Sequence, residues 1–392
     1  MKRIIALLLA AVMMLAMFAG CGNSSSAAEE TASSAAAEEA TEEAPAEEAA
    51  ASDVSVAMIT DYGDITDQSF NQTTYEACKE YCEANGLQFN YYKPASDSDE
   101  DRIAMIESAI DEGYTTIVMP GYAFGAAIAA TADQYPEITF IALDVSAGDL
   151  GDGYVMPENL YCAVYQEELC GYMAGYAAVK LGYTKLGFLG GMAVPAVIRY
   201  GFGFVQGADA AAAELGLSDV ELKYCYGNQF YGDADITAAM DTWYADGTEI
   251  VFACGGGIYT SAAEAAAKVD GKVIGVDVDQ AATIDGAYGE GMTVTSAMKG
   301  LAATVKTMLG KVVDGSFSGA VVDNLGLVSD VPEENYVQLA GSTQFSDSFT
   351  QDDYAALVKA MNAGEITVNN DTSGAAADFA TVITVIDQGN IK

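Results

Sequence analysis

The chain has 392 residues, too many for one ordinary core and about the number needed for two α/β lobes with appendages. Its 57 acidic and 16 basic residues give a formal net charge of −41, which repels phosphates and anionic headgroups and argues against a nucleic-acid partner. The absence of histidine excludes Ser-His-Asp and Cys-His catalysis and removes the commonest transition-metal ligand, so we expect no metal site and no cofactor.

Residues 1–20 are predicted to be an export signal. Lys2 and Arg3 precede an apolar run that ends at Ala19 and is too short for a comfortable membrane span. The stretch from Phe18 to Cys21 resembles the lipobox of bacterial lipoproteins, in which the cysteine is lipidated and becomes the new N-terminus. We therefore expect a lipid anchor on Cys21 that holds the protein on the outer side of the cell membrane. Ordinary signal cleavage is the alternative.

Residues 21–52 consist mainly of Ser, Ala and Glu with a single proline. Such a composition cannot bury enough apolar surface to fold. A coil of this length reaches roughly 30 Å, enough to hold a domain away from a membrane. We predict a disordered acidic tether.

From Asp53 onward, strand and helix patterns alternate, which indicates parallel βαβ units. The first run of predicted strands comprises Ser55–Thr60, Gln88–Tyr92, Thr116–Pro120 and Thr139–Asp144, with helices near Ser69–Ala84, Glu100–Glu112 and Phe124–Tyr135. Ser69 is expected to cap the first of these helices. The same plan repeats after Asn159, with strands at Lys185–Leu189, Leu222–Tyr226, Ile250–Cys254 and Val273–Asp277 and helices near Glu167–Leu181, Val197–Leu215, Ala234–Asp246 and Ser261–Lys268.

The remaining segments are too few for a third domain and are best explained as strands and helices that cross back between two lobes. They are a strand at Thr293–Ala297, a helix near Gly300–Val313, strands near Val321–Val328 and a helix near Asp352–Asn362. We assign 53–160 plus 293–322 to an N-terminal lobe and 161–292 plus 323–392 to a C-terminal lobe. The predicted fold is that of a two-lobed type I periplasmic binding protein. Each lobe is a doubly wound, mainly parallel sheet flanked by helices, and crossing strands form the hinge.

The predicted strands end in acids or glycines. In an open parallel sheet, ligands bind in the crevice at the carboxyl ends of the strands. The acids expected there are Asp61, Asp144 and Asp277, and the aromatic residues nearby are Tyr62, Phe70, Tyr122, Tyr200 and Phe202. Flat π surfaces beside carboxylate acceptors suit a neutral ring that carries N–H and O–H donors, whereas a phosphate would be repelled. A nucleoside fits this pattern and a nucleotide does not.

Seven cysteines are present, of which Cys21 is assigned to the lipid. The other six form no C-x-x-C pair, so a metal site is not expected, and most are predicted to be small buried apolar residues.

Four motifs follow one another between Ser55 and Val313. They are Asp61-Tyr-Gly-Asp-Ile-Thr-Asp67-Gln-Ser69-Phe70-Asn71, Gly190-Gly191 with Pro195-Ala-Val-Ile-Arg199-Tyr200-Gly-Phe-Gly-Phe204, Gly275-Val-Asp277-Val-Asp279-Gln280 and Thr295-Ser296-Ala-Met-Lys299. Together they resemble the basic-membrane-protein family of ABC-transporter substrate-binding lipoproteins, best known as purine nucleoside receptors. The resemblance implies a non-catalytic receptor for adenosine, guanosine or inosine that hands its ligand to a membrane permease. We expect it to act as a monomer.

The resemblance also implies roles for individual residues. Asp61 and Asp144 would hydrogen-bond the purine. Phe70 would stack on one face of the base, and Tyr200, or alternatively Phe202, on the other. The ribose hydroxyls would be held by the turn Gly255, Gly256, Gly257 together with Asp277, which accepts, and Lys299, which donates and offsets the buried charge.

Tyr62 and Tyr122 complete the predicted ligand-binding set, to which Asn71 also belongs, although Asn71 and Asp67 could instead brace their loop. The chain departs from the family at Tyr62, where Asn is common, at Gly63-Asp64, where Gly-Gly is usual, and at Tyr200, where Phe is usual. Two other functions remain possible: a sensor lipoprotein for a sugar or signal molecule, and a nucleoside-cleaving α/β enzyme.

Overall fold

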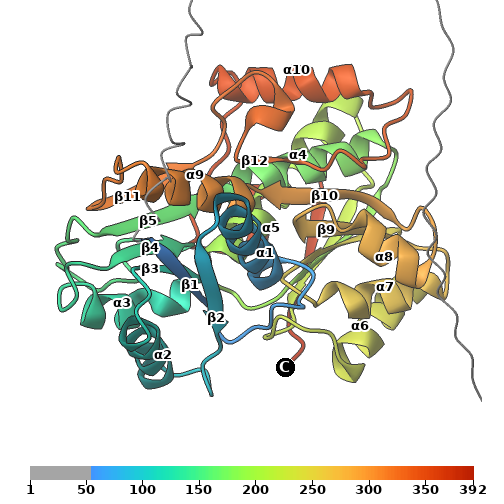
Figure 1. Cartoon of the computed structure of the whole chain (residues 1–392). Coiled ribbons are helices and arrows are strands. Elements are labelled where there is room, and N and C mark those ends of the chain that lie inside the picture. Colours follow the sequence, from blue (N-terminus) through green and yellow to red (C-terminus); the bar gives the residue numbers. More distant parts are fainter. Residues whose placement is uncertain (1–53) are drawn as a thin grey trace, which may run out of the picture. The chain divides into compact units, whose positions relative to one another are not determined.

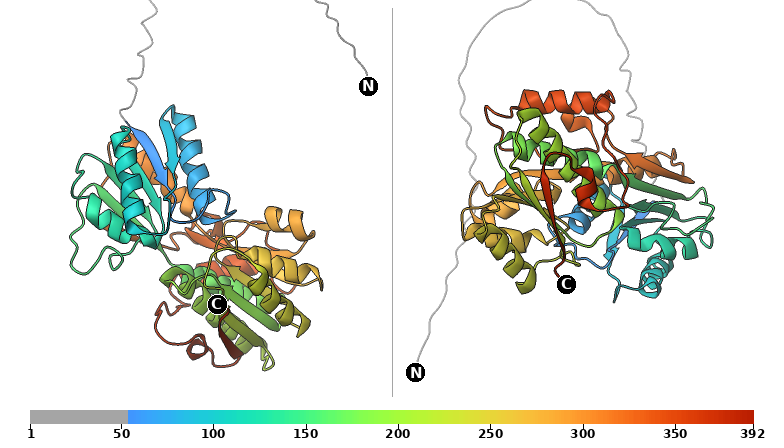
Figure 2. Two further views of the ribbon diagram at one scale, coloured as in Figure 1. Left: turned by 90° about the horizontal axis from the view of Figure 1, so that it is seen from below. Right: turned by 180° about the vertical axis from the view of Figure 1, so that it is seen from behind.

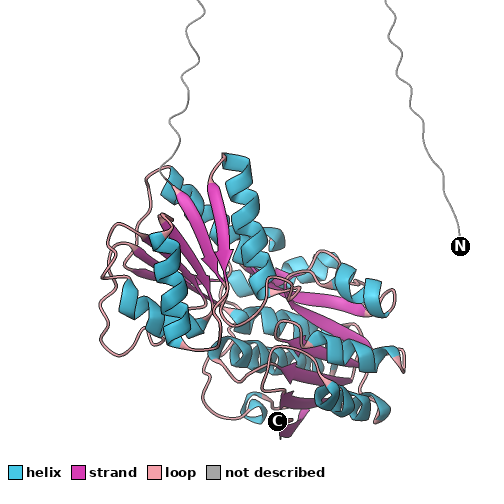
Figure 3. Ribbon diagram, turned by 60° about the horizontal axis from the view of Figure 1, so that its bottom comes forward, coloured by secondary structure: helices cyan, strands magenta, loops and turns pink. Residues whose placement is uncertain are grey.

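A computed structural model describes residues 54–392 (Figure 1). The predicted export signal, the tether and the lipidation site at Cys21 lie outside this part. Within it, two mainly parallel sheets carry helices on their faces (Figure 3). No helix of the described residues is long and apolar enough to cross a membrane.

The first sheet has the strand order β11-β5-β4-β3-β1-β2, and all its strands run parallel. Its strands are β1 (Ser55–Ile59), β2 (Gln88–Tyr92), β3 (Thr116–Pro120), β4 (Thr139–Leu143), β5 (Leu160–Tyr165) and β11 (Val321–Leu325). The helices of this lobe are α1 (Phe70–Asn85), α2 (Asp99–Asp111), α3 (Gly125–Thr131) and α9 (Leu301–Val313), which packs against α1.

The second sheet has the order β12-β10-β9-β8-β6-β7-β13, with β12 antiparallel to β10. Its strands are β6 (Lys185–Gly190), β7 (Glu221–Tyr226), β8 (Ile250–Cys254), β9 (Lys272–Asp277), β10 (Thr293–Lys299), β12 (Val337–Leu339) and β13 (Thr384–Asn390). The helices are α4 (Glu167–Lys180), α5 (Pro195–Leu215), α6 (Ala234–Ala245), α7 (Tyr259–Ala267), α8 (Ala281–Tyr288) and α10 (Gln351–Asn362). Figure 2 shows the C-terminal segment against this lobe, where β13 pairs with β7.

Both sheets use the same winding. The order β2-β1-β3-β4-β5 in the first sheet corresponds to β7-β6-β8-β9-β10 in the second, so the predicted repetition of one architecture is confirmed. The chain crosses between the sheets three times, after β5, after β10 and after β11.

The predicted lobe boundaries were wrong at three strands. β11 (Val321–Leu325) lies wholly in the first sheet, although the prediction began the second lobe again at residue 323. Residues 160–165 form β5, the fifth strand of the first sheet, although the prediction ended that lobe at 160. Residues 293–299 form β10 of the second sheet, although the prediction placed 293–322 in the first lobe. A buried parallel strand looks alike in either sheet, because its apolar sequence does not say which neighbour it pairs with.

Helices α4 and α5 pack with their backbones in contact. Gly171 and Gly175 on α4 face Gly203 and Gly207 on α5, and a Cβ on any of the four would lie 2.0 or 2.1 Å from a carbonyl oxygen of the other helix. Only glycine permits this approach, which fixes the first turns of the two helices side by side.

The six cysteines of the described residues are free and buried, as predicted: Cys78, Cys82, Cys162, Cys170, Cys225 and Cys254.

Candidate functional site

A cavity of about 820 Å³ lies at the carboxyl ends of the strands and is lined by residues of both sheets. Every residue that the sequence predicted to bind ligand lines it: Asp61, Tyr62, Phe70, Asn71, Tyr122, Asp144, Tyr200, Gly255, Gly256, Gly257, Asp277 and Lys299. The winding explains this convergence, since parallel strands bring their ends to one edge.

Asp61 follows β1 and turns its carboxylate back onto its own loop. Its Oδ1 accepts hydrogen bonds from the backbone nitrogens of Tyr62 at 2.6 Å and Gly63 at 2.5 Å. Burial raises the pKa of Asp61 to about 6, against the lowering effect of these bonds. Gly63 is needed here because a Cβ would lie 2.3 Å from Nδ2 of Asn71. Tyr122, half-buried at the end of β3, belongs to the same wall.

Asn71 braces this loop. Its Oδ1 accepts from the backbone nitrogen of Asp61 at 3.4 Å, and its Nδ2 donates to Oδ2 of Asp67 at 3.1 Å. Asp67 also accepts from the backbone nitrogens of Ser69 and Gln72 and so caps α1. These contacts agree with the bracing alternative for Asp67 and Asn71.

Ser69 does not cap α1 with its side chain, contrary to the prediction. Its hydroxyl donates instead to Oδ2 of Asp277 in the other lobe at 2.6 Å, because Asp67 already satisfies the exposed amides of the helix. The loop of the first lobe is therefore tied directly to the end of β9.

Asp144 follows β4 and Asp277 is the last residue of β9, and both have left-handed backbone conformations, with φ of 57° and 65°. Aspartate tolerates this region better than most residues. Oδ1 of Asp144 is buried and has no hydrogen-bond partner among the described residues. Burial raises the pKa of Asp277, whereas Lys299 and the Ser69 hydroxyl oppose the rise.

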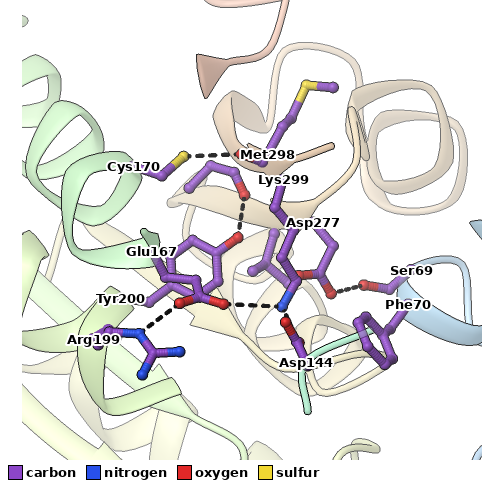
Figure 4. Close-up of polar contacts among 12 residues, drawn as sticks. Ser69, Phe70, Asp144, Glu167, Cys170, Arg199, Tyr200, Asp277, Met298 and Lys299 are labelled. Atoms are coloured by element: carbon purple, nitrogen blue, oxygen red, sulfur yellow. Dashed lines mark hydrogen bonds and ion pairs between the residues drawn. The ribbon is translucent and has the colours of Figure 1, made fainter. Parts of the chain in front are cut away.

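Lys299 is the cation at the centre of the site (Figure 4). Its Nζ lies 2.5 Å from Oδ2 of Asp144, 3.4 Å from Oε1 of Glu167 and 3.7 Å from Oδ1 of Asp277. Burial lowers the pKa of Lys299, but attraction to these three carboxylates outweighs it and raises the pKa above its ordinary value. Lys299 therefore stays charged.

Aromatic rings surround the same ammonium. Nζ of Lys299 lies 4.9 Å from the ring centre of Phe70, 5.5 Å from that of Tyr165 and 5.8 Å from that of Tyr200. These separations are within the range of cation–π attraction.

A further aromatic ring of the second lobe, that of Phe230, also lines the cavity and was not predicted from the sequence. Its centre is 6.2 Å from that of Tyr62, and it packs on Gly255, where a Cβ would lie 2.9 Å from the ring. Tyr200 lines the cavity but is only 1% exposed, with its hydroxyl donating to the carbonyl of Ala297. The alternative Phe202 stacks on Phe379 at 4.6 Å and is not among the lining residues.

Glu167 was not predicted to be part of the site, and Arg199 was named only as a residue of a motif, with no role assigned to it. Nε of Arg199 donates to Oε2 of Glu167 at 2.7 Å, and the Glu167 side chain is fully buried. A buried acid in the first turn of a helix has no sequence signal that separates it from an exposed one. Within residues 54–392, no group of acids and cysteines is arranged to hold a metal ion.

The sequence model of one family, described as "ABC transporter substrate-binding protein PnrA-like", matches residues 54–371. The "ABC transporter nucleoside-binding protein BmpA" of Lactococcus lactis is 29% identical over 242 residues, 58% of this chain and 65% of that protein. "Basic membrane protein B" of Borreliella burgdorferi is 29% identical over 245 residues, 58% of this chain and 66% of its own length. The matched part thus spans just under two thirds of each relative.

Among solved structures, an ABC transporter solute-binding protein from Aeropyrum pernix superimposes with a TM-score of 0.62 at 20% identity. The alignment covers 81% of this chain and 88% of that one. The predicted two-lobed fold of the type I periplasmic binding proteins is confirmed.

Proposed function

This chain belongs to the PnrA-like family of ABC transporter substrate-binding proteins, and we propose that it captures a purine nucleoside between its two lobes and delivers it to a membrane permease. Family membership confirms the resemblance read from the motifs. No catalysis is part of this function. The lipid anchor at Cys21 would keep the receptor on the outer face of the membrane, beside the permease.

The main support for the proposal is that aromatic side chains and buried hydrogen-bond acceptors line the same cavity. Phe70 from the first lobe and Phe230 from the second can enclose a flat base, and Asp61 and Asp144 can accept from its N–H groups. The unpartnered Oδ1 of Asp144 favours a ligand that brings a donor, because an unsatisfied buried acceptor costs free energy. The Lactococcus lactis relative is named as nucleoside-binding.

Asp277 and Lys299, which lie next to Asp144, supply an acceptor and a donor for the ribose hydroxyls. Gly256 and Gly257 also line the cavity, and the carbonyl of Phe230 accepts from the nitrogen of Gly257 at 2.8 Å. The glycine turn thus also places the Phe230 loop.

Adenosine is expected to bind at least about a hundredfold more tightly than AMP, since a phosphate would enter a cavity lined by Asp67, Asp144 and Asp277. Calorimetry on both ligands tests this, and equal affinities would contradict the proposal. A melting-temperature panel of nucleosides, bases and sugars provides the control. If sugars alone raise the melting temperature, the sensor alternative replaces this one, and release of free base from inosine would favour the enzyme.

Replacing Phe230 by alanine is expected to weaken adenosine binding roughly 5- to 150-fold, because stacking on an aromatic side chain contributes about 1–3 kcal/mol per base. Isothermal titration measures the change. Tyr91→Ala on the edge strand β2 removes a 39% exposed aromatic side chain away from the cavity and serves as the control. Unchanged affinity in Phe230→Ala would show that this ring does not contact the base.

A further inference from the structure

We propose that Glu167 is a positioning residue for the ligand site: it holds the ammonium of Lys299 in the second lobe, ready to donate to the ribose hydroxyls. The inference rests on the proposed function for the identity of the ligand. It assigns part of the nucleoside affinity to a residue that does not line the cavity.

Glu167 lies behind Lys299, away from the ligand. Its side chain is fully buried and is not among the lining residues, whereas Asp144 and Asp277 both are. A ligand hydroxyl or N–H can therefore engage these two aspartates, but it does not reach Glu167. Of the three carboxylates around Nζ, Glu167 alone remains fully available to Lys299 when a ligand is bound.

The three acids also differ in the lobe that carries them. Asp144 follows β4 of the first sheet, whereas Glu167 begins α4 and Lys299 ends β10, both in the second lobe. If the lobes move apart to admit a ligand, the contact between Lys299 and Asp144 is broken. Glu167 keeps its place beside Lys299, so the ammonium retains a buried partner while the site is open.

Arg199 fixes Glu167 from the other side. The 2.7 Å bond from its Nε occupies Oε2, which leaves Oε1 directed at Nζ of Lys299 (Figure 4). The close packing of α4 on α5 holds these partners together, since a Cβ on Gly171 would lie 2.1 Å from the carbonyl oxygen of Tyr200, the residue after Arg199. Glu167 is thus held in one position by its partners, unlike an acid on the surface.

Glu168 offers a matched control. It is the next residue of α4 and is also buried, but it approaches Arg199 only to 4.0 Å and forms no ion pair with Lys299 among the contacts of the described residues. Glu168→Gln replaces a carboxyl group in the same turn without removing a partner of Lys299.

The first test compares adenosine with 2′,3′-dideoxyadenosine, which lacks the 2′- and 3′-hydroxyls of the ribose and keeps the 5′-hydroxyl. Glu167→Gln is expected to weaken adenosine binding about tenfold, the loss expected of a weakened charge-assisted hydrogen bond. The dideoxy ligand is expected to lose nothing, and Glu168→Gln is expected to change neither affinity. An equal loss for both ligands, or no loss for either, would overturn the inference, because general damage to the cavity does not distinguish the two ligands.

The second test needs no ligand. In protein labelled with ¹⁵N-lysine, the Nζ signal of Lys299 is expected to exchange its protons with water faster in Glu167→Gln than in the wild type or in Glu168→Gln. An unchanged signal contradicts the positioning role. If the wild type binds no nucleoside, the proposed function fails, and this measurement still decides whether Glu167 positions Lys299.

Discussion

Replacing Lys299 by methionine is expected to lower the free energy of unfolding by about 3–5 kcal/mol near pH 8. This is the loss typical of removing one partner of a buried ion pair while the other partner stays charged. The variant leaves Asp144, Glu167 and Asp277 around an apolar side chain. Arg199 offsets one of these charges and the other two have no buried cation. Urea unfolding at fixed pH measures the difference from the wild type.

The loss in this variant is expected to shrink as the pH falls. Burial already raises the pKa of Glu167 and of Asp277, and Lys299 opposes the rise in both. Without Lys299 both pKa values lie further above their unfolded values. A carboxyl whose folded pKa is raised destabilises the fold increasingly as the pH rises through the interval between the unfolded and folded values. A larger fraction of these carboxyls is protonated at pH 5 than at pH 8, so the defect is smaller at pH 5.

The control for this prediction is Lys306→Met. Nζ of Lys306 lies 2.8 Å from Oε2 of Glu80, but both side chains are exposed, so removing the pair is expected to change stability little at either pH. A Lys299→Met defect of the same size at pH 5 and pH 8 would show that lost packing, and not uncompensated charge, is its cause.

Replacing Gly175 by alanine is expected to lower the free energy of unfolding by about 1–3 kcal/mol, the range for overpacking a well-filled core. Its Cβ would lie 2.1 Å from the carbonyl oxygen of Phe204, so α4 and α5 must separate to admit it. Thermal unfolding measures the loss. Since glycine is a poor helix former, alanine at this position would stabilise the helix if space were available.

Gly310→Ala in α9 separates these two effects. The atom nearest to its Cβ would be the hydroxyl oxygen of Tyr81 at 3.7 Å, an ordinary contact, so this change is expected to raise stability by up to about 1 kcal/mol. If Gly175→Ala also stabilised the protein, the contact between α4 and α5 would not be as close as described.

Residues at strand ends were the part of the site that could be predicted from sequence. Asp61, Asp144 and Asp277 follow clear apolar runs, and parallel winding leaves their side chains no other edge to occupy. Most of the strands were equally clear, but β5, β12 and β13 were not among the predicted ones. β12 has three residues and β13 is largely exposed, so neither carries the apolar pattern of a buried strand.

Phe230 could not be predicted in the same way. It lies in a loop between β7 and α6, where no periodicity links a residue to a face. Tyr200 was predicted to stack on the base because it stands in a family motif. Its position on α5 instead buries the side chain in the core, with its ring centre 5.8 Å from Nζ of Lys299. The sequence also does not show which sheet a strand joins: β5 and β10 hold equivalent positions in the two sheets, and only the tertiary pairing assigns each of them.

The positive φ angles of Asp144 and Asp277 set limits on how the cavity can diverge over evolutionary time. Asparagine tolerates this backbone conformation about as well as aspartate, whereas most other side chains are strained in it. One substitution to asparagine exchanges a carboxylate oxygen for an amide donor at the same point, with the strand end unmoved. The hydrogen-bonding character of the cavity can therefore change at either of these two positions while the backbone around it stays the same.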